Sequence, residues 1–149
     1  MIKLHKIEPM EILRAVALRD GMWMLLAPYR VRLHTSEGVI EASMKAGWIT
    51  DFRSGSGAVD AIVPKTGNDH YNAIVLCHDL FYSGWLTRGL ADSLLDQGMR
   101  LAGIASWRVK LATLAVGLFG GIGYYYLTAP MKDPYQHNRS FEAIKWGAK

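Results

Sequence analysis

A stretch of about twenty residues without a charged side chain, Leu111 to Pro130, places the strongest constraint on how this chain folds. Its length matches what a helix needs to cross a bilayer, and the spacing Gly117-x-x-x-Gly121 is typical of closely packed membrane helices. Thr113 and four glycines dilute its hydrophobicity. We therefore prefer a helix buried in a protein core, with a transmembrane helix at 111–130 as the alternative.

The rest of the chain is long enough to supply such a core, since 149 residues with 50% hydrophobic content predict one folded domain. The net charge of +4 is scattered along the sequence. No helix shows a basic face with base-reading residues, so nucleic-acid binding is not indicated. Cys77 is the only cysteine, which excludes an intramolecular disulfide. No apolar signal peptide opens the chain, so we expect synthesis in the cytoplasm.

The first third of the chain predicts a small antiparallel sheet. Apolar and polar residues alternate in two segments, as they do in half-buried strands, and Ser36-Glu37-Gly38 between two apolar runs predicts a hairpin turn. Proline at position 9 predicts that the next residues, Met10 to Leu18, form a short helix. The predicted strands are Ile2 to Ile7, Met22 to Leu33, Val39 to Ala42 and Trp48 to Phe52.

The remaining chain predicts three helices. They run from Asn68 to Tyr82, from a Thr87 cap to Ala102, and onward from Ser106. In the second helix, Asp96 and Arg100 have the acid-before-base order that suits an i,i+4 pair. We predict an α+β fold, with the sheet packed on these helices in a single domain over residues 1–130. Residues 131–149 form a C-terminal arm that wraps the domain or docks onto a neighbour through Phe141 and Trp146.

The chemically richest segment is Cys77-His78-Asp79-Leu80-Phe81-Tyr82, which is followed by Ala91-Asp92-Ser93. On a helix, His78 and Tyr82 lie on one face and Asp79 points elsewhere. A second helix can bring Asp92 back to His78, which is how a water-activating histidine is held by a carboxylate. His78, Asp92 and Tyr82 are therefore the candidate catalytic residues, although a helical histidine is more often structural.

The loop Arg53-Ser54-Gly55-Ser56-Gly57-Ala58 is the second candidate site. Gly55 and Gly57 permit backbone shapes that point several carbonyl or amide groups at one ion, although most such loops are only turns. Because Asp79 leaves the helix in another direction than His78, we expect it to bind a metal ion or a basic side chain. Asp79, Gly55 and Gly57 are therefore the candidate metal ligands.

Spaced motifs along the chain resemble a known family. They are Gly47-Trp48-Ile49-Thr50-Asp51-Phe52-Arg53-Ser54, Ile62-Val63-Pro64, His78-Asp79-Leu80-Phe81-Tyr82, Arg88 and Ala91-Asp92. This order resembles domain of unknown function family 1353, found mainly in tailed bacteriophages and prophages. That family reads Gly-Phe-x-Thr-Asp-Phe-Ala-Ser-x-Pro, then His-Asp-x-Leu-Tyr, then Arg-x-x-Ala-Asp. The resemblance covers about residues 22–126 and departs from the family at Gly55 to Ala61. It implies a phage origin and no established activity.

A second similarity is chemical. His-Asp-x-x-Tyr followed by Ala-Asp on another helix looks like the core of phospholipase A2 enzymes. This resemblance implies that His78 is the general base, that Asp92 orients it, and that Tyr82 bonds a carboxylate. It also implies Ca²⁺ at Asp79, assisted by carbonyl groups of the Gly55–Gly57 loop. The glycine loop of those enzymes lies much closer to the His-Asp pair than Gly57 does here.

Two functions remain open at the level of sequence. In the first, the chain is a phage accessory or virion-associated protein, possessing a structural network of His78, Asp79, Asp92, Thr50 and Asp51. It then acts by assembly with other virion proteins or with itself. In the second, it is a calcium-dependent hydrolase that contacts phospholipid or membrane during entry or lysis. We place the first above the second, and solvent access to His78 discriminates between them.

Overall fold

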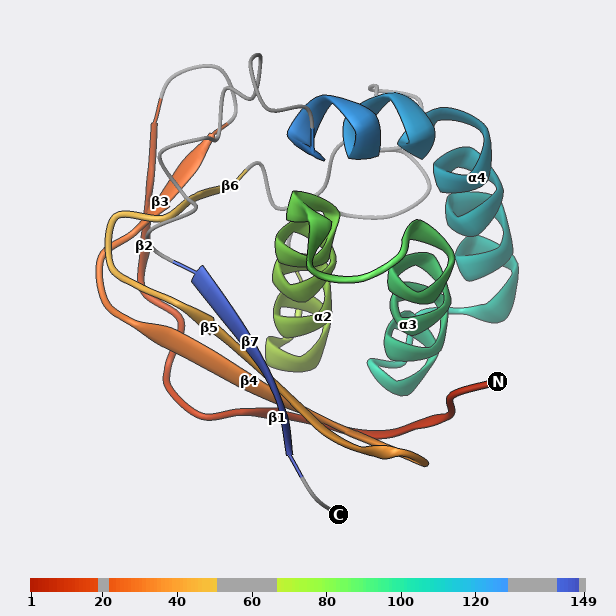
Figure 1. Ribbon diagram of the computed structural model, residues 1–149, viewed down its shortest axis with the longest axis horizontal. Coiled ribbons are helices and arrows are strands. Elements are labelled where there is room, and N and C mark those ends of the chain that lie inside the picture. Colours follow the sequence, from red (N-terminus) through yellow and green to blue (C-terminus); the bar gives the residue numbers. More distant parts are fainter. Residues whose placement is uncertain (19–21, 51–66, 129–141, 148–149) are drawn as a thin grey trace.

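The computed structural model describes residues 1–18, 22–50, 67–128 and 142–147, and it places the strands on one side of the molecule and the helices on the other (Figure 1). The N-terminal strands and C-terminal helices confirm the predicted α+β class. The strands form two antiparallel sheets where one was predicted. The larger sheet has the order β1 (Leu4–Pro9), β4 (Tyr29–Thr35), β5 (Gly38–Met44) and β7 (Glu142–Gly147), and the smaller has β2 (Ala15–Ala17), β3 (Trp23–Leu25) and β6 (Ile49–Thr50).

The β4–β5 hairpin forms as its alternating pattern predicts. Tyr29, Val31 and Leu33 are buried in the core, while the residues between them point outward. Thr35 pairs with Gly38 across the turn, and Gly38 has a φ of 127°. A side chain there would be strained, and its Cβ would lie 2.6 Å from the carbonyl oxygen of Gly147. Glycine at position 38 thus serves both the turn and the approach of β7.

The predicted helix at Met10 to Leu18 is wrong. Residues 15–17 form strand β2, where Val16 lies opposite Met24 of β3. The backbone N–H of Leu26 also donates to the carbonyl of Arg14, at 2.9 Å. Pairing with β3 therefore satisfies backbone groups that a short isolated helix satisfies less well.

Three helices follow, as predicted, and local caps fix where the first two begin. Helix α2 (Asp69–Leu80) starts after Asn68, whose side chain accepts from the N–H of Tyr71 at 2.9 Å. Helix α3 (Arg88–Leu101) starts after Thr87, which accepts from the N–H of Leu90 at 3.4 Å. The predicted break at residues 83–86 differs in detail, because the chain continues from α2 into a π-helical segment, η2 (Phe81–Trp85).

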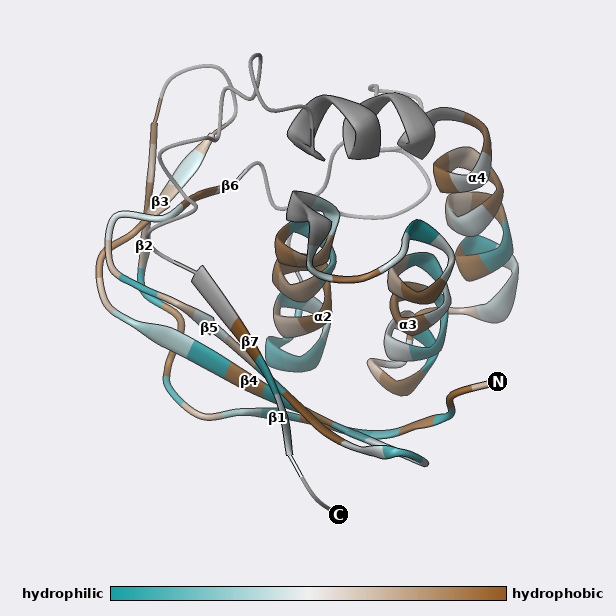
Figure 2. Ribbon diagram, viewed as in Figure 1, coloured by the Kyte–Doolittle hydropathy of each residue, from teal (hydrophilic) through white to brown (hydrophobic). Residues whose placement is uncertain are grey.

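Helix α2 is the centre of the core, and Figure 2 shows its hydrophobic residues in brown. It crosses α3 closely, because a Cβ built on Gly98 would lie 2.2 Å from Ile74. Only glycine at position 98 allows the two helices this approach. The buried residues of α2 are Tyr71, Ala73, Ile74, Val75, Leu76, Cys77 and Leu80.

Helix α4 (Ser106–Thr128) is buried along one face only over residues 106–118. Val109 and Ala112 are buried, whereas Leu111, Leu114 and Leu118 are exposed, so the expected core helix is wrong for this part of the segment. Only one side of the helix meets α3, and the opposite side has no covering element among the described residues. Within those same residues, no helix has the length and apolar character needed to cross a membrane. The later turns of α4 run at a steep angle to its first turns (Figure 1).

Candidate functional site

The candidate site lies where α2, η2 and α3 meet. His78 near the end of α2 and Tyr82 in η2 are four residues apart, and their ring centroids are separated by 4.2 Å. The backbone N–H of Phe81 reaches the carbonyls of both Cys77 and His78, where the α-helix passes into the π-helical segment. The predicted sharing of one face by His78 and Tyr82 is therefore realised by local helical geometry.

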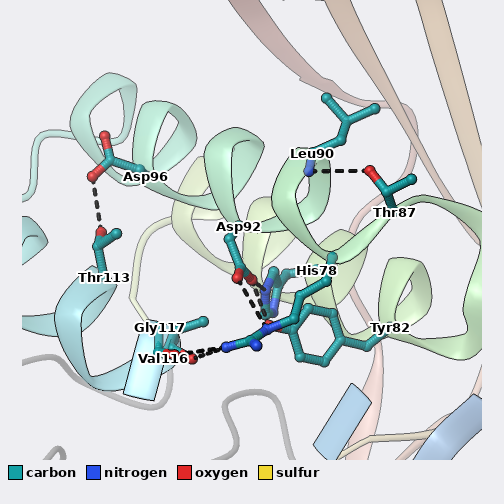
Figure 3. Close-up of polar contacts among 10 residues, drawn as sticks. His78, Tyr82, Thr87, Leu90, Asp92, Asp96, Thr113, Val116 and Gly117 are labelled. Atoms are coloured by element: carbon teal, nitrogen blue, oxygen red, sulfur yellow. Dashed lines mark hydrogen bonds and ion pairs between the residues drawn. The ribbon is translucent and has the colours of Figure 1, made fainter. Parts of the chain in front are cut away.

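Asp92 of α3 joins these two side chains (Figure 3). Its Oδ1 lies 2.9 Å from Nε2 of His78 and accepts a hydrogen bond of 2.5 Å from the hydroxyl of Tyr82. His78, Asp92 and Tyr82 were predicted to share one site, and the structure brings them together. We call these residues and Arg88 the Asp92 cluster.

Arg88 connects the cluster to α4. Its Nε lies 3.6 Å from Oδ2 of Asp92, and its Nη2 donates to the carbonyls of Val116 and Gly117 at 3.0 and 2.8 Å. Among the described residues, Nε of Arg88 is buried without a hydrogen-bond partner. The sequence pointed to Arg88 only through the family motif. Its spacing of four residues from Asp92 is the local signal for an ion pair, whereas its contact with α4 has no local signal.

The surroundings of Asp92 favour its charged form. Burial by itself raises the pKa of Asp92, but hydrogen bonds from His78 and Tyr82 and the charge of Arg88 outweigh it, so the pKa lies below its ordinary value. Burial, together with the bond to Asp92, raises the pKa of Tyr82. The tyrosine thus remains a hydroxyl donor. The side chains of His78 and Asp92 keep 15% and 18% of their exposure, so neither is sealed from solvent.

This arrangement fixes the tautomer of the histidine. A charged carboxylate only accepts hydrogen bonds, so Nε2 of His78 carries a proton toward Asp92. In a neutral imidazole, the second nitrogen, Nδ1, then has a free lone pair and can accept a proton from another molecule. The pair has the chemistry of a general base held by a carboxylate.

Asp79 points away from this cluster, as its position next to His78 predicts. Its Oδ2 accepts a hydrogen bond of 2.6 Å from Thr50 of β6, which is completely buried. The contact ties α2 to the smaller sheet. Thr50 and Asp79 thus belong to a contact with β6, rather than to the contacts that His78 makes with Asp92 and Tyr82. The predicted network also included Asp51, which lies outside the described residues.

Of the three predicted metal ligands, the structure describes only Asp79. Gly55 and Gly57 lie outside the described residues, and Asp79 is engaged by Thr50. The part of the chain that the structure describes contains no group of three or more His, Cys, Asp or Glu residues that could hold a metal ion. Calcium binding by Asp79, Gly55 and Gly57 stays a prediction.

Of the two aromatic residues predicted to lie at an interface, the structure describes one. Phe141 lies outside the described residues, whereas Trp146 lies on β7 with about half of its surface exposed. Residues 142–147 pair with β5 of the same chain, so this portion of the C-terminal segment adds a strand to the larger sheet. The sequence showed no alternation that would have predicted the pairing.

Comparison with protein families finds one family model, and the matched residues include all four residues of the Asp92 cluster. The model of the family described as "Protein of unknown function (DUF1353)" matches residues 23–116. The matched segment is more than half of the chain and includes His78, Tyr82, Arg88 and Asp92. Searches of curated proteins and of solved structures found no match. The chain belongs to the DUF1353 family of proteins of unknown function.

Proposed function

We propose that this chain is a hydrolase in which His78 and Asp92 activate water. The observation that carries the proposal is the 2.9 Å contact from Nε2 of His78 to Asp92, which leaves Nδ1 as the proton acceptor. The partial exposure of both side chains favours this function over a sealed structural network. Solvent access is what a general base needs in order to meet water and substrate.

The proposed reaction is hydrolysis of a carboxylic ester. Nδ1 of His78 takes a proton from water as the water oxygen attacks the ester carbonyl, which gives a tetrahedral oxyanion. The protonated imidazole then gives that proton to the departing alkoxide, so acid and alcohol leave and the histidine is regenerated. Asp92 stabilises the positively charged imidazole, and Tyr82 and Arg88 hold Asp92 in place.

The mechanism uses no metal step. A calcium ion takes six to eight oxygen ligands, and of the predicted set only Asp79 is described, with Oδ2 already accepting from Thr50. If Ca²⁺ binds with help from residues 55 and 57, it would polarise the ester carbonyl. The similarity of the His-Asp-x-x-Tyr and Ala-Asp motifs to phospholipase A2 cores makes a phospholipid the ester to try first.

The test is fatty-acid release from phospholipid vesicles, with and without calcium, by the wild type and by His78→Gln. Glutamine can still donate to Asp92, so the fold should survive, and a thermal denaturation curve checks this. The matched control is His34→Gln, because His34 also pairs with a carboxylate, Glu8, at 2.6 Å but lies on the outer face of the sheet. We expect release to vanish only in His78→Gln. Release that survives in this variant, or no release by the wild type, would refute the proposal.

A second function is supported by the way the Asp92 cluster links four elements. Asp92 meets side chains of α2 and η2, and Arg88 extends the contacts to α4. In this alternative the cluster is structural, and the chain is a phage accessory or virion protein that assembles with other virion proteins or with itself. The half-exposed Trp146 on the edge strand β7 supplies a contact for such assembly.

Light scattering of the purified protein tests the self-association form of this alternative. Assembly through β7 predicts particles larger than one chain, and Trp146→Ala should reduce their mass. The exposed Trp107 of α4 provides the control substitution, Trp107→Ala, which should leave the mass unchanged. A single-chain mass at every concentration would exclude self-association.

A further inference from the structure

The outer face of α4 carries a continuous row of exposed apolar side chains. Trp107, Leu111, Leu114 and Leu118 follow one another at intervals of four, three and four residues, and their exposures lie between 41% and 67%. Such spacing places them on one side of a helix. We call these four residues the α4 ridge.

The packing of α4 holds the ridge outward. Val109 and Ala112 are buried on the opposite face, and the hydroxyl of Thr113 donates to Asp96 of α3 at 2.8 Å. Arg88 holds the carbonyls of Val116 and Gly117. These contacts fix the rotation of the helix about its axis, so the apolar row cannot turn into the core.

Basic residues flank the ridge on both sides. At about 100° per residue, Lys110 lies to one side of the row and Arg108 to the other. Both side chains are exposed, and the guanidinium of Arg108 lies 5.2 Å from the ring centroid of Trp107. No acidic residue occurs anywhere in α4, and the whole chain has a net charge of +4. The surface thus combines a narrow apolar row with positively charged margins.

We propose that the α4 ridge docks onto the surface of an anionic phospholipid membrane, with the helix lying along it. Trp and Leu side chains enter the boundary between headgroups and acyl chains, while Arg108 and Lys110 meet lipid phosphates. A second copy of this chain fits the surface less well. It would bring the same two bases to the margins, and α4 offers no acidic side chain to pair with them. The inference does not rest on the proposed hydrolysis, because docking uses neither His78 nor Asp92.

The experiment is sedimentation of the full chain with vesicles of phosphatidylcholine alone and with one quarter phosphatidylglycerol. Ether-linked lipids keep the vesicles intact whether or not the chain hydrolyses esters. The wild type should bind the anionic vesicles at low salt and bind less as salt rises. Leu114→Ser should weaken binding by about tenfold, since one buried leucine contributes that order of free energy.

Leu26→Ser is the matched control, because Leu26 is as exposed as Leu114, at 57% against 58%, but lies outside α4. It should bind like the wild type, as should His78→Gln. Substituting Arg108→Gln together with Lys110→Gln should remove the preference for anionic vesicles. Absence of wild-type binding, equal effects of Leu26→Ser and Leu114→Ser, or a dimer that Leu114→Ser dissociates would each overturn the proposal, the last in favour of a second copy.

Discussion

Two aspartates on α3, Asp92 and Asp96, lie one turn apart and meet their partners in different ways (Figure 3). Each has an arginine four residues away. Arg100 follows Asp96, and its Nε and Nη2 lie 2.9 and 3.3 Å from the two carboxylate oxygens. Arg88 precedes Asp92, and its Nε stays 3.6 Å from the carboxylate. The acid-before-base order at Asp96 and Arg100 favours the closer pair.

Asp96 and Arg100 form a local ion pair within one helix, whereas the cluster around Asp92 depends on the tertiary fold. Asp96 obtains both arginine contacts within its own helix, and Thr113 adds one bond from α4. Asp92 instead depends on His78 and Tyr82, which come from other elements. Burial raises the pKa of Asp96, but Arg100 and Thr113 outweigh it and hold that pKa below its ordinary value. Both carboxylates are therefore charged. The described partners of Asp96 are Arg100 and Thr113, whereas Asp92 contacts an imidazole.

The largest expected difference is between the two alanine substitutions. Asp92→Ala removes the acceptor of the Tyr82 hydrogen bond and the carboxylate beside the Arg88 guanidinium, which should lower the free energy of unfolding by about 3 kcal/mol. Asp96→Ala exposes Arg100 to water and should lower it by about 1 kcal/mol. Urea denaturation of the three proteins measures both values. Equal losses of unfolding free energy would mean that the two aspartates contribute equally to stability, which would contradict this comparison.

Acid should remove the contribution of Asp92 in a defined range of pH. The pKa of Asp92 in the folded chain lies below the unfolded value, which is about 3.9, so its charge stabilises the fold above about pH 4. That contribution is lost as the pH falls through the lower, folded-state pKa. The free energy of unfolding of the wild type and of Asp92→Asn should be measured from about pH 6 to about pH 2.5. The difference between the two free energies should narrow only in the acid range. Because both proteins contain Asp96, its titration contributes equally to the two free energies. A difference in free energy of unfolding that stays constant across the range would contradict the assignment of this pH dependence to Asp92.

Tyr82→Phe isolates one hydrogen bond of the Asp92 cluster. Phenylalanine keeps the ring beside His78 and removes the hydroxyl that donates to Asp92, so the free energy of unfolding should fall by about 1 kcal/mol. Chemical denaturation measures the change. If the variant is as stable as the wild type, the hydroxyl does not hold Asp92 and the cluster must be reassigned to His78 and Arg88.

Thr113→Val gives the smallest expected effect, about 0.5 kcal/mol. Valine has nearly the shape of threonine, and Asp96 retains both contacts with Arg100 after the hydroxyl is removed. A shift of the thermal midpoint by a few degrees at most should follow. A loss as large as that of Tyr82→Phe would show that α3 and α4 are held together mainly at Asp96.

Sequence reasoning succeeded where the determining contacts are short in range. Asn68 and Thr87 cap helices through residues three positions away, and His78 with Tyr82 follow helical spacing. It failed at residues 15–17, because β2 exists through its pairing with β3. It also failed at Leu111, because an apolar side chain is buried only if another element covers it. The approach of Arg88 to α4 depends in the same way on how two helices cross.

The position of β7 at the edge of the larger sheet has a consequence for folding during synthesis. Its partner β5 is made about a hundred residues earlier, so that pairing is one of the most distant in the chain. Until β7 emerges from the ribosome, one edge of β5 offers unpaired backbone groups to any neighbouring chain. Slow completion of the sheet, and aggregation when it is interrupted, are the expected cost of closing a sheet with a strand that is made so late.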